Sequence, residues 1–323
     1  MSVYIWVAES MLNLFFLLLL TAGVFISNSI AGESSPVLCE HYRQDHNQSA
    51  HNTKAREDIP YGNGLLWEIR NPDDDISYIF GTMHSQDRKV TAIPPPVRLA
   101  LQKSRIILME VVPDQQAQQE FIESIYFMDE SNLQSLLDRE IYEALVNTIA
   151  DYGVPDENVS QLKPWAAFTL IGRPRPVNAM SQEQVLMQLA LNSNKTIAGL
   201  ETMAELAVVL DKIPIDDQIV ILNDTVCNHT DIIKQTRDLV DMYLERDLAG
   251  IVIFNEQPHY DEAIFERFMQ RILYDRNQRM MERIEPYLQQ GGTFIAVGAS
   301  HLPDEKGLLK LLENKGYKIS RVY

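Results

Sequence analysis

Two segments of this chain repeat the order buried strand, glycine, histidine, helix and strand, and this repetition limits the fold more than any other feature. Phe80-Gly81-Thr82-Met83-His84 can be aligned with Val297-Gly298-Ala299-Ser300-His301. The helical stretch and strand that follow each segment also match, with 97–103 and 106–109 corresponding to 307–314 and 317–319. An internal repeat of this kind points to related halves of one sheet.

A mainly helical region separates the two units, interrupted by one short strand at 196–200. Apolar spacing predicts helices over 115–128, 133–152, 165–171, 181–191, 202–210, 216–243 and 259–288. Ser181 with Gln184, and Thr202 with Glu205, form capping-box patterns that predict helix starts. Upstream, the stretches 65–69 and 76–80 flank a turn and predict a hairpin. We predict an α/β fold, a mixed sheet built from two pseudo-repeated strand, Gly-x-x-His, helix and strand units with a large helical insertion.

The first 31 residues differ from the rest of the chain, because residues 11–30 carry no charge and include four successive leucines. This composition predicts an export segment, and Ser29 and Ala31 resemble a signal-peptidase site. We predict that residues 1–31 are a signal peptide, with a retained membrane anchor through 11–30 as the alternative. Glu9 and the lack of Lys or Arg before the apolar stretch depart from the usual positive start. The protein is therefore expected to be exported, periplasmic or extracellular.

Residues 32–63 form a predicted polar linker, and the folded domain is expected to span 64–323. The formal charge of -17 disfavours nucleic acid as a partner and leaves membrane contact only to an uncleaved N-terminal segment. The two cysteines, Cys39 and Cys227, can form a disulfide in an oxidising compartment, but two unrelated thiols are equally compatible with the sequence. No Cys-x-x-Cys motif occurs, which excludes a structural zinc finger.

Both histidines follow strands that stop at a glycine, and ligand sites in α/β sheets are usually built at the carboxyl ends of strands. A single Gly-x-x-His is more often a turn with a hydrogen-bonded histidine. Two such motifs in matching positions favour a shared ligand instead. We predict that His84 and His301 bind a divalent metal ion, with Glu110 as the third ligand. Glu110 ends an apolar strand, where its charge requires a cation or hydrogen bonds.

Three further residues are candidates for catalysis together with Glu110. Glu201 ends the strand at 196–200 and is the second choice for ligation or general-base work, although a first-turn acid of the next helix is an equal alternative. Arg276 and Asn277 lie on the long predicted helix that leads to the second unit. Arg276 can hold a substrate carboxylate or stabilise an oxyanion, but ion pairing on the helix surface explains it equally well.

Over residues 65–323 the chain resembles the TraB/PrgY/GumN family, whose animal members are the Tiki metalloproteases. The resemblance rests on the two histidine motifs and on further short segments: 107–110, 162–166, 199–202, 275–277 and 297–303. It implies a fold shared with Tiki and erythromycin-esterase proteins, with the family's two Gly-x-x-His motifs at His84 and His301 and its acidic residue at Glu110. It also implies peptide cleavage that depends on manganese or cobalt, and zinc is a further candidate.

The leading hypothesis is therefore an exported metal-dependent hydrolase, a peptidase of the TraB and Tiki type, acting on a peptide or small-molecule substrate. The alternatives are a non-catalytic exported protein that binds a ligand or haem in the same cleft, and a metal-independent esterase. The esterase is the least favoured, because no Gly-x-Ser-x-Gly nucleophile motif occurs. The sequence leaves the oligomeric state open.

Overall fold

The computed structural model describes residues 39–40, 42, 55–112, 114–256 and 260–323. The predicted signal peptide or anchor, including residues 11–30, lies outside the described residues, as does most of the predicted linker. In the part of the chain that is described, no helix combines the length and the apolar character needed to cross a bilayer.

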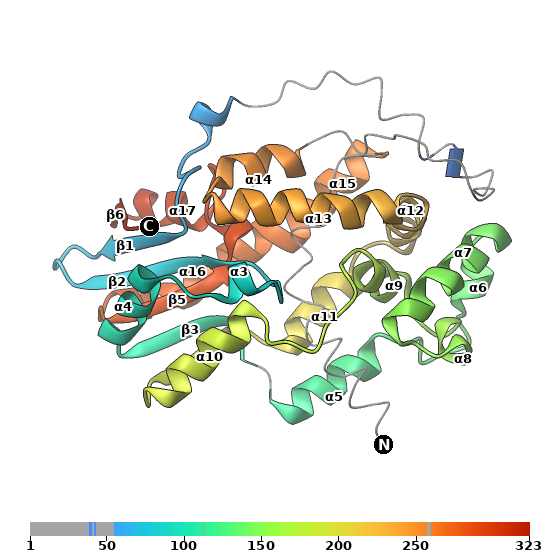
Figure 1. The fold of residues 1–323 in the computed structure, drawn as a ribbon, viewed down its shortest axis with the longest axis horizontal. Helices are drawn as coiled ribbons and strands as arrows, with labels where there is room; N and C mark the ends of the chain where they lie inside the picture. Colours follow the sequence, from blue (N-terminus) through green and yellow to red (C-terminus); the bar gives the residue numbers. More distant parts are fainter. Residues whose placement is uncertain (1–38, 41, 43–54, 113, 257–259) are drawn as a thin grey trace.

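A six-stranded sheet in the order β4-β3-β5-β2-β1-β6 organises the domain (Figure 1). The four strands β4, β3, β5 and β2 are parallel neighbours, whereas β1 is antiparallel to both β2 and β6. The predicted α/β fold with a mixed sheet is therefore present. The strands are β1 (Leu66–Arg70), β2 (Ile76–Thr82), β3 (Ile106–Val111), β4 (Thr196–Glu201), β5 (Thr293–Gly298) and β6 (Lys318–Arg321).

The two predicted repeat units share the order strand, helix and strand, but they cross the sheet differently. Helix α4 (Pro95–Lys103) joins β2 to β3, which lie on either side of β5. Helix α17 (Leu308–Asn314) joins β5 to β6, which are separated by β2 and β1. The pseudo-repeat of related halves is thus not confirmed by the sheet order and stays a prediction from the sequence.

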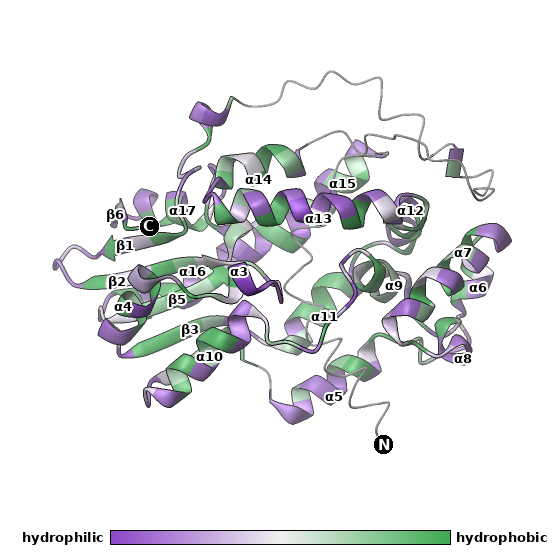
Figure 2. Ribbon diagram, in the orientation of Figure 1, coloured by the Kyte–Doolittle hydropathy of each residue, from purple (hydrophilic) through white to green (hydrophobic). Residues whose placement is uncertain are grey.

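Helices cover both faces of the sheet. The chain moves along the sheet from β2 to β3 and β4 and then back to β5, and right-handed crossovers in opposite directions place their helices on opposite faces. Helices α4 and α10 (Gln182–Asn192) lie over one face, and α16 (Asp275–Leu288) and α17 lie over the other (Figure 1). Because both faces are covered, the central strands are apolar along their length, which is most evident for β3 in Figure 2. Ile79, Leu108 and Ile295 are fully buried in this first core.

The helical insertion has a second core of its own, centred on the fully buried Trp165. Val111, the last residue of β3, and Met203, just after the end of β4, belong to this second core, so the insertion packs against the carboxyl ends of the strands. Its helices are α5 (Gln115–Ser124), α6 (Leu133–Leu136), α7 (Arg139–Ile149), α8 (Asp156–Val159), α9 (Pro164–Ile171), α11 (Met203–Asp211), α12 (Ile215–Cys227) and α15 (Glu262–Met269).

The remaining helical elements complete the wall beside the sheet. Helix α13 (His229–Leu244) alternates polar and apolar residues along its length, as Figure 2 shows. The others are α3 (Arg88–Thr91), α14 (Leu248–Asn255), the 3-10 turns η3 (Arg56–Asp58), η4 (Ala150–Tyr152) and η6 (Ala299–His301), and the π-helical turn η5 (Gln270–Tyr274).

Helix starts are confirmed better than helix lengths. Both predicted capping boxes are present, at Ser181 with Gln184 and at Thr202 with Glu205. The single helix predicted over 216–243 is instead two helices, α12 and α13, which meet at Asn228. Helix α14 was not predicted, because its sequence Leu-Ala-Gly-Ile-Val-Ile-Phe-Asn is apolar on all sides and rich in β-branched residues.

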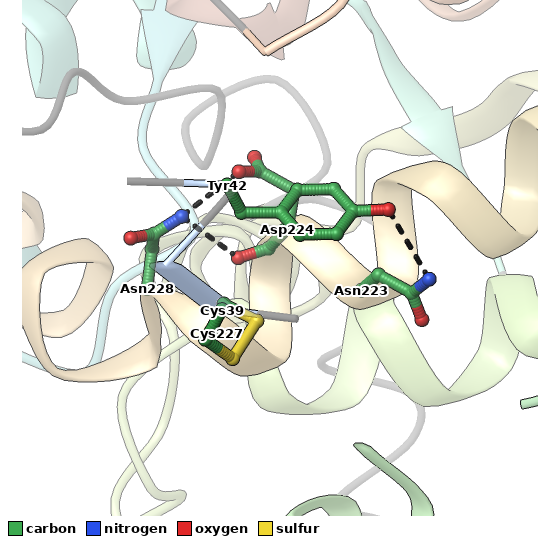
Figure 3. Close-up of a disulfide and its surroundings, with 6 residues drawn as sticks. All are labelled: Cys39, Tyr42, Asn223, Asp224, Cys227 and Asn228. Atoms are coloured by element: carbon green, nitrogen blue, oxygen red, sulfur yellow. Dashed lines mark hydrogen bonds between the residues drawn. A yellow bond between two sulfur atoms is a disulfide. The ribbon is translucent and has the colours of Figure 1, made fainter. Parts of the chain in front are cut away.

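A disulfide between Cys39 and Cys227 ties the N-terminal part of the chain to the end of α12 (Figure 3). Near this bond, Asn223 Nδ2 donates a hydrogen bond to the Tyr42 hydroxyl at 3.2 Å. The Tyr42 ring also lies against the Tyr260 ring, with centroids 4.2 Å apart. Of the two arrangements that the sequence allows, the structure has the disulfide. The segment predicted as a polar linker therefore adds Cys39 and Tyr42 to the second core.

Replacing both Cys39 and Cys227 with alanine should lower the free energy of unfolding by about 2–4 kcal/mol. The disulfide joins residues 188 positions apart, so its loss frees a long loop in the unfolded chain. Urea unfolding followed by circular dichroism measures the change. Dithiothreitol should destabilise the native protein to a similar extent and leave the variant unaffected. Equal unfolding midpoints for the native protein and the variant would contradict this prediction.

Asp224 lies beside the disulfide and is half-buried (Figure 3). Burial raises the pKa of its carboxyl group from 3.8 to about 7, although a 2.9 Å hydrogen bond from Asn228 Nδ2 acts to lower it. The folded protein therefore holds this proton more tightly than the unfolded chain does. The resulting contribution to stability is present below the unfolded value and is lost as the pH rises through about 7.

The variant Asp224→Asn should not lose stability in this way as the pH rises, because asparagine does not ionise. Its free energy of unfolding should exceed that of the native protein by roughly 1–3 kcal/mol at about pH 8, with the difference shrinking towards about pH 4. Asparagine keeps an acceptor for Asn228, so the packing next to the disulfide is preserved. Urea unfolding of both proteins across this pH range tests the prediction, which fails if the difference does not vary with pH.

Candidate functional site

The carboxyl ends of four parallel strands meet at one edge of the sheet, and the predicted site residues lie there. Thr82, at the end of β2, pairs with Gly298, at the end of β5, so His84 and His301 follow the ends of adjacent strands. Glu110 is the penultimate residue of β3, and Glu201 is the last residue of β4. The sequence-based expectation that these side chains share an edge agrees with the strand pairing.

The glycine of the first motif allows the turn of the second motif to pack directly against it. A Cβ atom at Gly81 would lie 2.9 Å from Leu302 Cδ1 and 3.0 Å from Ala299 Cα. Because Ala299 contributes a backbone atom to this contact, a side chain at position 81 would push the 3-10 turn η6 away from β2. Gly81 is therefore needed for the close approach of the two histidine motifs.

His301 is fully buried, and Asn277 fixes its orientation. Asn277 Nδ2 donates to the Lys306 carbonyl oxygen at 2.9 Å, which turns Oδ1 towards His301 Nδ1 at 2.5 Å. Nδ1 therefore carries the proton, and Nε2 carries the lone pair. Burial, and then the charge of Arg276, hold the pKa of His301 well below its ordinary value. The imidazole is thus neutral, which is the form that binds metal ions or accepts a proton.

The Nε2 atom of His301 has no hydrogen-bond partner among the described residues, although it is buried. It lies 3.9 Å from Glu110 Oε2. A metal ion bonded to both atoms at about 2.1 Å can span up to about 4.2 Å, so these two atoms are close enough to share an ion.

Arg276 joins Glu110 and Glu201 in a buried cluster of charges. Its Nη2 atom donates to both carboxylates, at 2.7 Å from Glu201 Oε2, and its Nε atom donates to the same oxygen at 2.9 Å. Arg279 Nη2 donates to the other oxygen of Glu201 at 3.0 Å. Burial acts to lower the pKa of Arg276, but the two carboxylates outweigh it and raise this pKa. The positive charge expected to compensate the buried Glu110 is therefore the guanidinium group of Arg276.

The π-helical turn η5 helps to place Arg276. It interrupts the long helix predicted over 259–288 immediately before Asp275. Arg276 Nη1 donates to the Ile272 carbonyl oxygen within this turn at 3.1 Å. Such single-turn π segments often occur at functional sites. With its guanidinium engaged on three sides and only 2% exposed, Arg276 positions the two carboxylates rather than a substrate.

His84 is held by the first turn of α10, which sequence reasoning did not connect to the site. His84 Nδ1 lies 2.9 Å from Glu183 Oε2, and both side chains are buried. Burial acts to raise the pKa of Glu183, but the contact with His84 outweighs it and lowers this pKa. The preceding residue, Gln182, accepts a hydrogen bond from the Met83 backbone N–H at 2.9 Å. The capping box at Ser181 predicts where this helix starts, but not which strand it faces.

Tyr243 of α13 reinforces the same loop. Its hydroxyl lies 2.9 Å from the Gly81 carbonyl oxygen and 2.9 Å from Gln182 Oε1. Gln182 Nε2 in turn donates to the Val90 carbonyl oxygen at 2.6 Å. The loop that carries His84 is therefore bonded to two helices and to α3, which keeps the imidazole in one orientation.

A cavity of about 570 Å³ opens beside His84. Residues 83–87, the loop 173–177 and the helix α13 form its walls. His301, Glu110, Glu201 and Arg276 do not line this cavity. The sheet edge therefore has two parts, an open part at His84 and a closed part around His301.

The described residues contain no group of three or more His, Cys, Asp or Glu side chains arranged to hold a metal ion. The structure brings together two of the three predicted ligands, His301 and Glu110, and holds His84 at the same edge through Glu183. The site of two histidines and one glutamate thus remains a prediction.

The variant Arg276→Met should lower the free energy of unfolding by about 3–5 kcal/mol, because it leaves Glu110 and Glu201 buried without their counter-charge. Arg279→Met provides a matched control on the same helix. Arg279 bonds to Glu201 as well, but its side chain is 35% exposed and Arg276 remains in place, so the loss should be about 1 kcal/mol or less. Urea unfolding at neutral pH measures both. Equal losses in the two variants would contradict the assigned role of Arg276.

Comparisons with known proteins confirm the family resemblance that the sequence predicts. The model of the TraB/PrgY/gumN family matches residues 65–321. The relatives include a Danio rerio protein named Metalloprotease TIKI2, which is 25% identical over 87% of this chain and 66% of its own length. Proteins named Metalloprotease TIKI1 from Xenopus tropicalis and Homo sapiens are each 24% identical over 80% of this chain and 61% of their own. No solved structure matches the chain.

The aligned region thus spans about three fifths to two thirds of the length of these relatives.

Proposed function

This chain belongs to the TraB/PrgY/gumN family, and from that premise we propose that it is a metal-dependent hydrolase that cleaves peptide bonds. One observation carries the proposal. The neutral imidazole of His301 keeps a buried Nε2 without a hydrogen-bond partner among the described residues, 3.9 Å from Glu110 Oε2. The relatives are named as metalloproteases, and these names support the same type of chemistry.

His301, Glu110 and His84 would hold the divalent ion, for which manganese, cobalt and zinc are the candidates to test. When bound, such an ion lowers the pKa of a water molecule and polarises the carbonyl group to be attacked. The ligand types fit this role, because neutral imidazole nitrogen and carboxylate oxygen suit all three metals.

The other residues of the site position these ligands. Asn277 holds His301 with the lone pair on Nε2, and Glu183 orients the His84 ring through Nδ1. Partners of this kind, one bond away from the ligands, strengthen metal binding in many enzymes. Glu110, whose Oε2 lies 3.9 Å from His301 Nε2, would also accept the proton that the attacking water molecule releases. Glu201, which is bonded to both Arg276 and Arg279, instead anchors Arg276.

We also propose that the protein is exported to the periplasm or the extracellular space. The disulfide between Cys39 and Cys227 supports this location, because disulfides persist in oxidising compartments. The apolar stretch at 11–30 supports it independently, as a cleaved signal peptide or a retained anchor. The proposed partner is a peptide substrate.

Metal uptake tests the proposal directly. The purified protein, dialysed against manganese, cobalt or zinc, should retain about one equivalent of ion. His301→Ala and Glu110→Gln should each lower the affinity by more than about 100-fold, because losing a ligand costs more than losing an outer-shell partner, which is worth about 10-fold to 100-fold. Elemental analysis over a range of free metal measures the change. His229→Ala is the control, because His229 pairs with Tyr152 in the helical insertion. Absent uptake, or uptake that the His301 and Glu110 variants leave unchanged, would refute the metal site.

Cleavage is a separate measurement. Peptide hydrolysis by the metal-loaded protein should stop on addition of a chelator and return when the metal is restored. Activity that survives chelation would favour a metal-independent esterase. Metal uptake without cleavage would favour a binding protein that uses the same cleft.

A further inference from the structure

The cavity beside His84 has the size and construction of a ligand site. Its volume of about 570 Å³ lies within the roughly 300–1,000 Å³ that is usual for clefts that bind small ligands or a few residues of a peptide. Apolar side chains make up much of the wall, with polar groups between them, which is the usual composition of such sites. The apolar lining residues are Met83, Pro174, Pro176, Val177, Ile233 and Val240.

The walls of this cavity are bonded to each other, so its shape is preorganised. Gln86 spans the gap between the loop that carries His84 and the loop after α9. Its Oε1 accepts from the Val177 backbone N–H at 2.9 Å, and its Nε2 donates to the Ala179 carbonyl oxygen at 2.5 Å. A preorganised cleft loses less conformational entropy when a ligand binds.

The charge of the cavity is opposite to that of the protein. Four cationic side chains line it, Lys89, Arg173, Arg175 and Arg237, against the two carboxylates of Asp87 and Asp241. Arg175 is ion-paired with Asp151, so Lys89, Arg173 and Arg237 supply the positive charge in excess of the two carboxylates. The whole chain carries a formal charge of -17. A cationic cleft with low-dielectric walls concentrates the field, so it attracts anionic groups that the rest of the surface repels.

One of these cations is buried in the wall. Arg173 is 4% exposed, and burial lowers the pKa of its guanidinium to about 10, so that it remains charged at neutral pH. Its backbone carbonyl oxygen accepts a hydrogen bond from the Tyr152 hydroxyl at 2.6 Å, which anchors this end of the loop to the helical insertion. A desolvated guanidinium interacts more strongly with a carboxylate than an exposed one does.

We propose that this cavity is the substrate cleft and that it selects peptides carrying carboxylate groups next to the segment bound at His84. The inference rests on the proposed function, because it names the substrate class of the same site. A carboxylate can come from an Asp or Glu side chain or from the C-terminus of the peptide. Apolar walls receive the neighbouring side chains, while Lys89, Arg173 and Arg237 pair with the anionic groups.

Binding in the presence of a chelator tests this inference without any cleavage. The probes are two dye-labelled peptides of equal length that differ only in having glutamate or glutamine at the central positions. Each is made with a free and with an amidated C-terminus, which separates side-chain carboxylates from the terminal one. Fluorescence anisotropy with the full chain should show tighter binding of a carboxylate-bearing peptide, and this preference should weaken as ionic strength rises.

Charge reversal then locates the binding site. Arg237→Glu should weaken binding of the preferred peptide about tenfold and binding of the fully neutral peptide less than about twofold. Lys234→Glu is the matched control, because Lys234 is exposed on the same helix α13 but does not line the cavity. Lys89→Glu, with Arg88→Glu as its control, repeats the comparison on α3.

Equal affinity for the charged and neutral peptides, or no binding of either, would overturn the inference. The same loss in Arg237→Glu and Lys234→Glu would overturn it too, because the effect would then come from net charge and not from the cavity. Selective binding without cleavage after metal loading would refute the proposed hydrolase and leave the cleft assignment standing. Cleavage after metal loading, without preferential binding of carboxylate-bearing peptides, would support the proposed hydrolase and refute the cleft assignment.

Discussion

The buried ion pairs of Arg276 are the interaction on which the candidate site depends. Arg276 reaches from α16 to the ends of two neighbouring strands, where it bonds to Glu110 of β3 and Glu201 of β4. Two carboxylates at this depth would be costly without a counter-charge, so the helix, the strands and the site are coupled. The next residue, Asn277, then faces His301. One helix turn therefore sets both the charge balance and the orientation of the imidazole.

The two histidine motifs share an edge of the sheet but have different surroundings. The His301 side is closed and filled by the arginine cluster, while the His84 side opens onto a cationic cavity. Gly81 allows the two motifs to touch, because a side chain there would meet the backbone of Ala299. In the proposed arrangement His84 belongs to both parts, because it would hold the metal ion together with His301 and Glu110 and also lines the cavity that would receive the substrate. In a protein of net charge -17, such local reversal of charge is itself a source of selectivity.

Much of the fold follows from local patterns in the chain. Short apolar runs that end at Gly81, Glu110 and Gly298 correspond to parallel strands, and both capping boxes start helices where expected. Two segments were predicted less well, because the spacing of their apolar residues does not reveal their structure. Helix α14 is apolar on every side, and the π-helical turn η5 interrupts a helix whose spacing looks continuous. In both cases packing against neighbours, and not local propensity, sets the structure.

The sequence by itself determined that two histidines and two glutamates lie at the ends of strands, because strand period and glycine positions are local properties. Only the tertiary structure decided their partners. Arg276 lies 166 residues from Glu110, and Glu183 lies 99 residues from His84. Such contacts depend on strand order and on which helix face packs at the edge. Strand order and the choice of helix face are not visible as local patterns in one sequence, because both are set when the two hydrophobic cores are buried together.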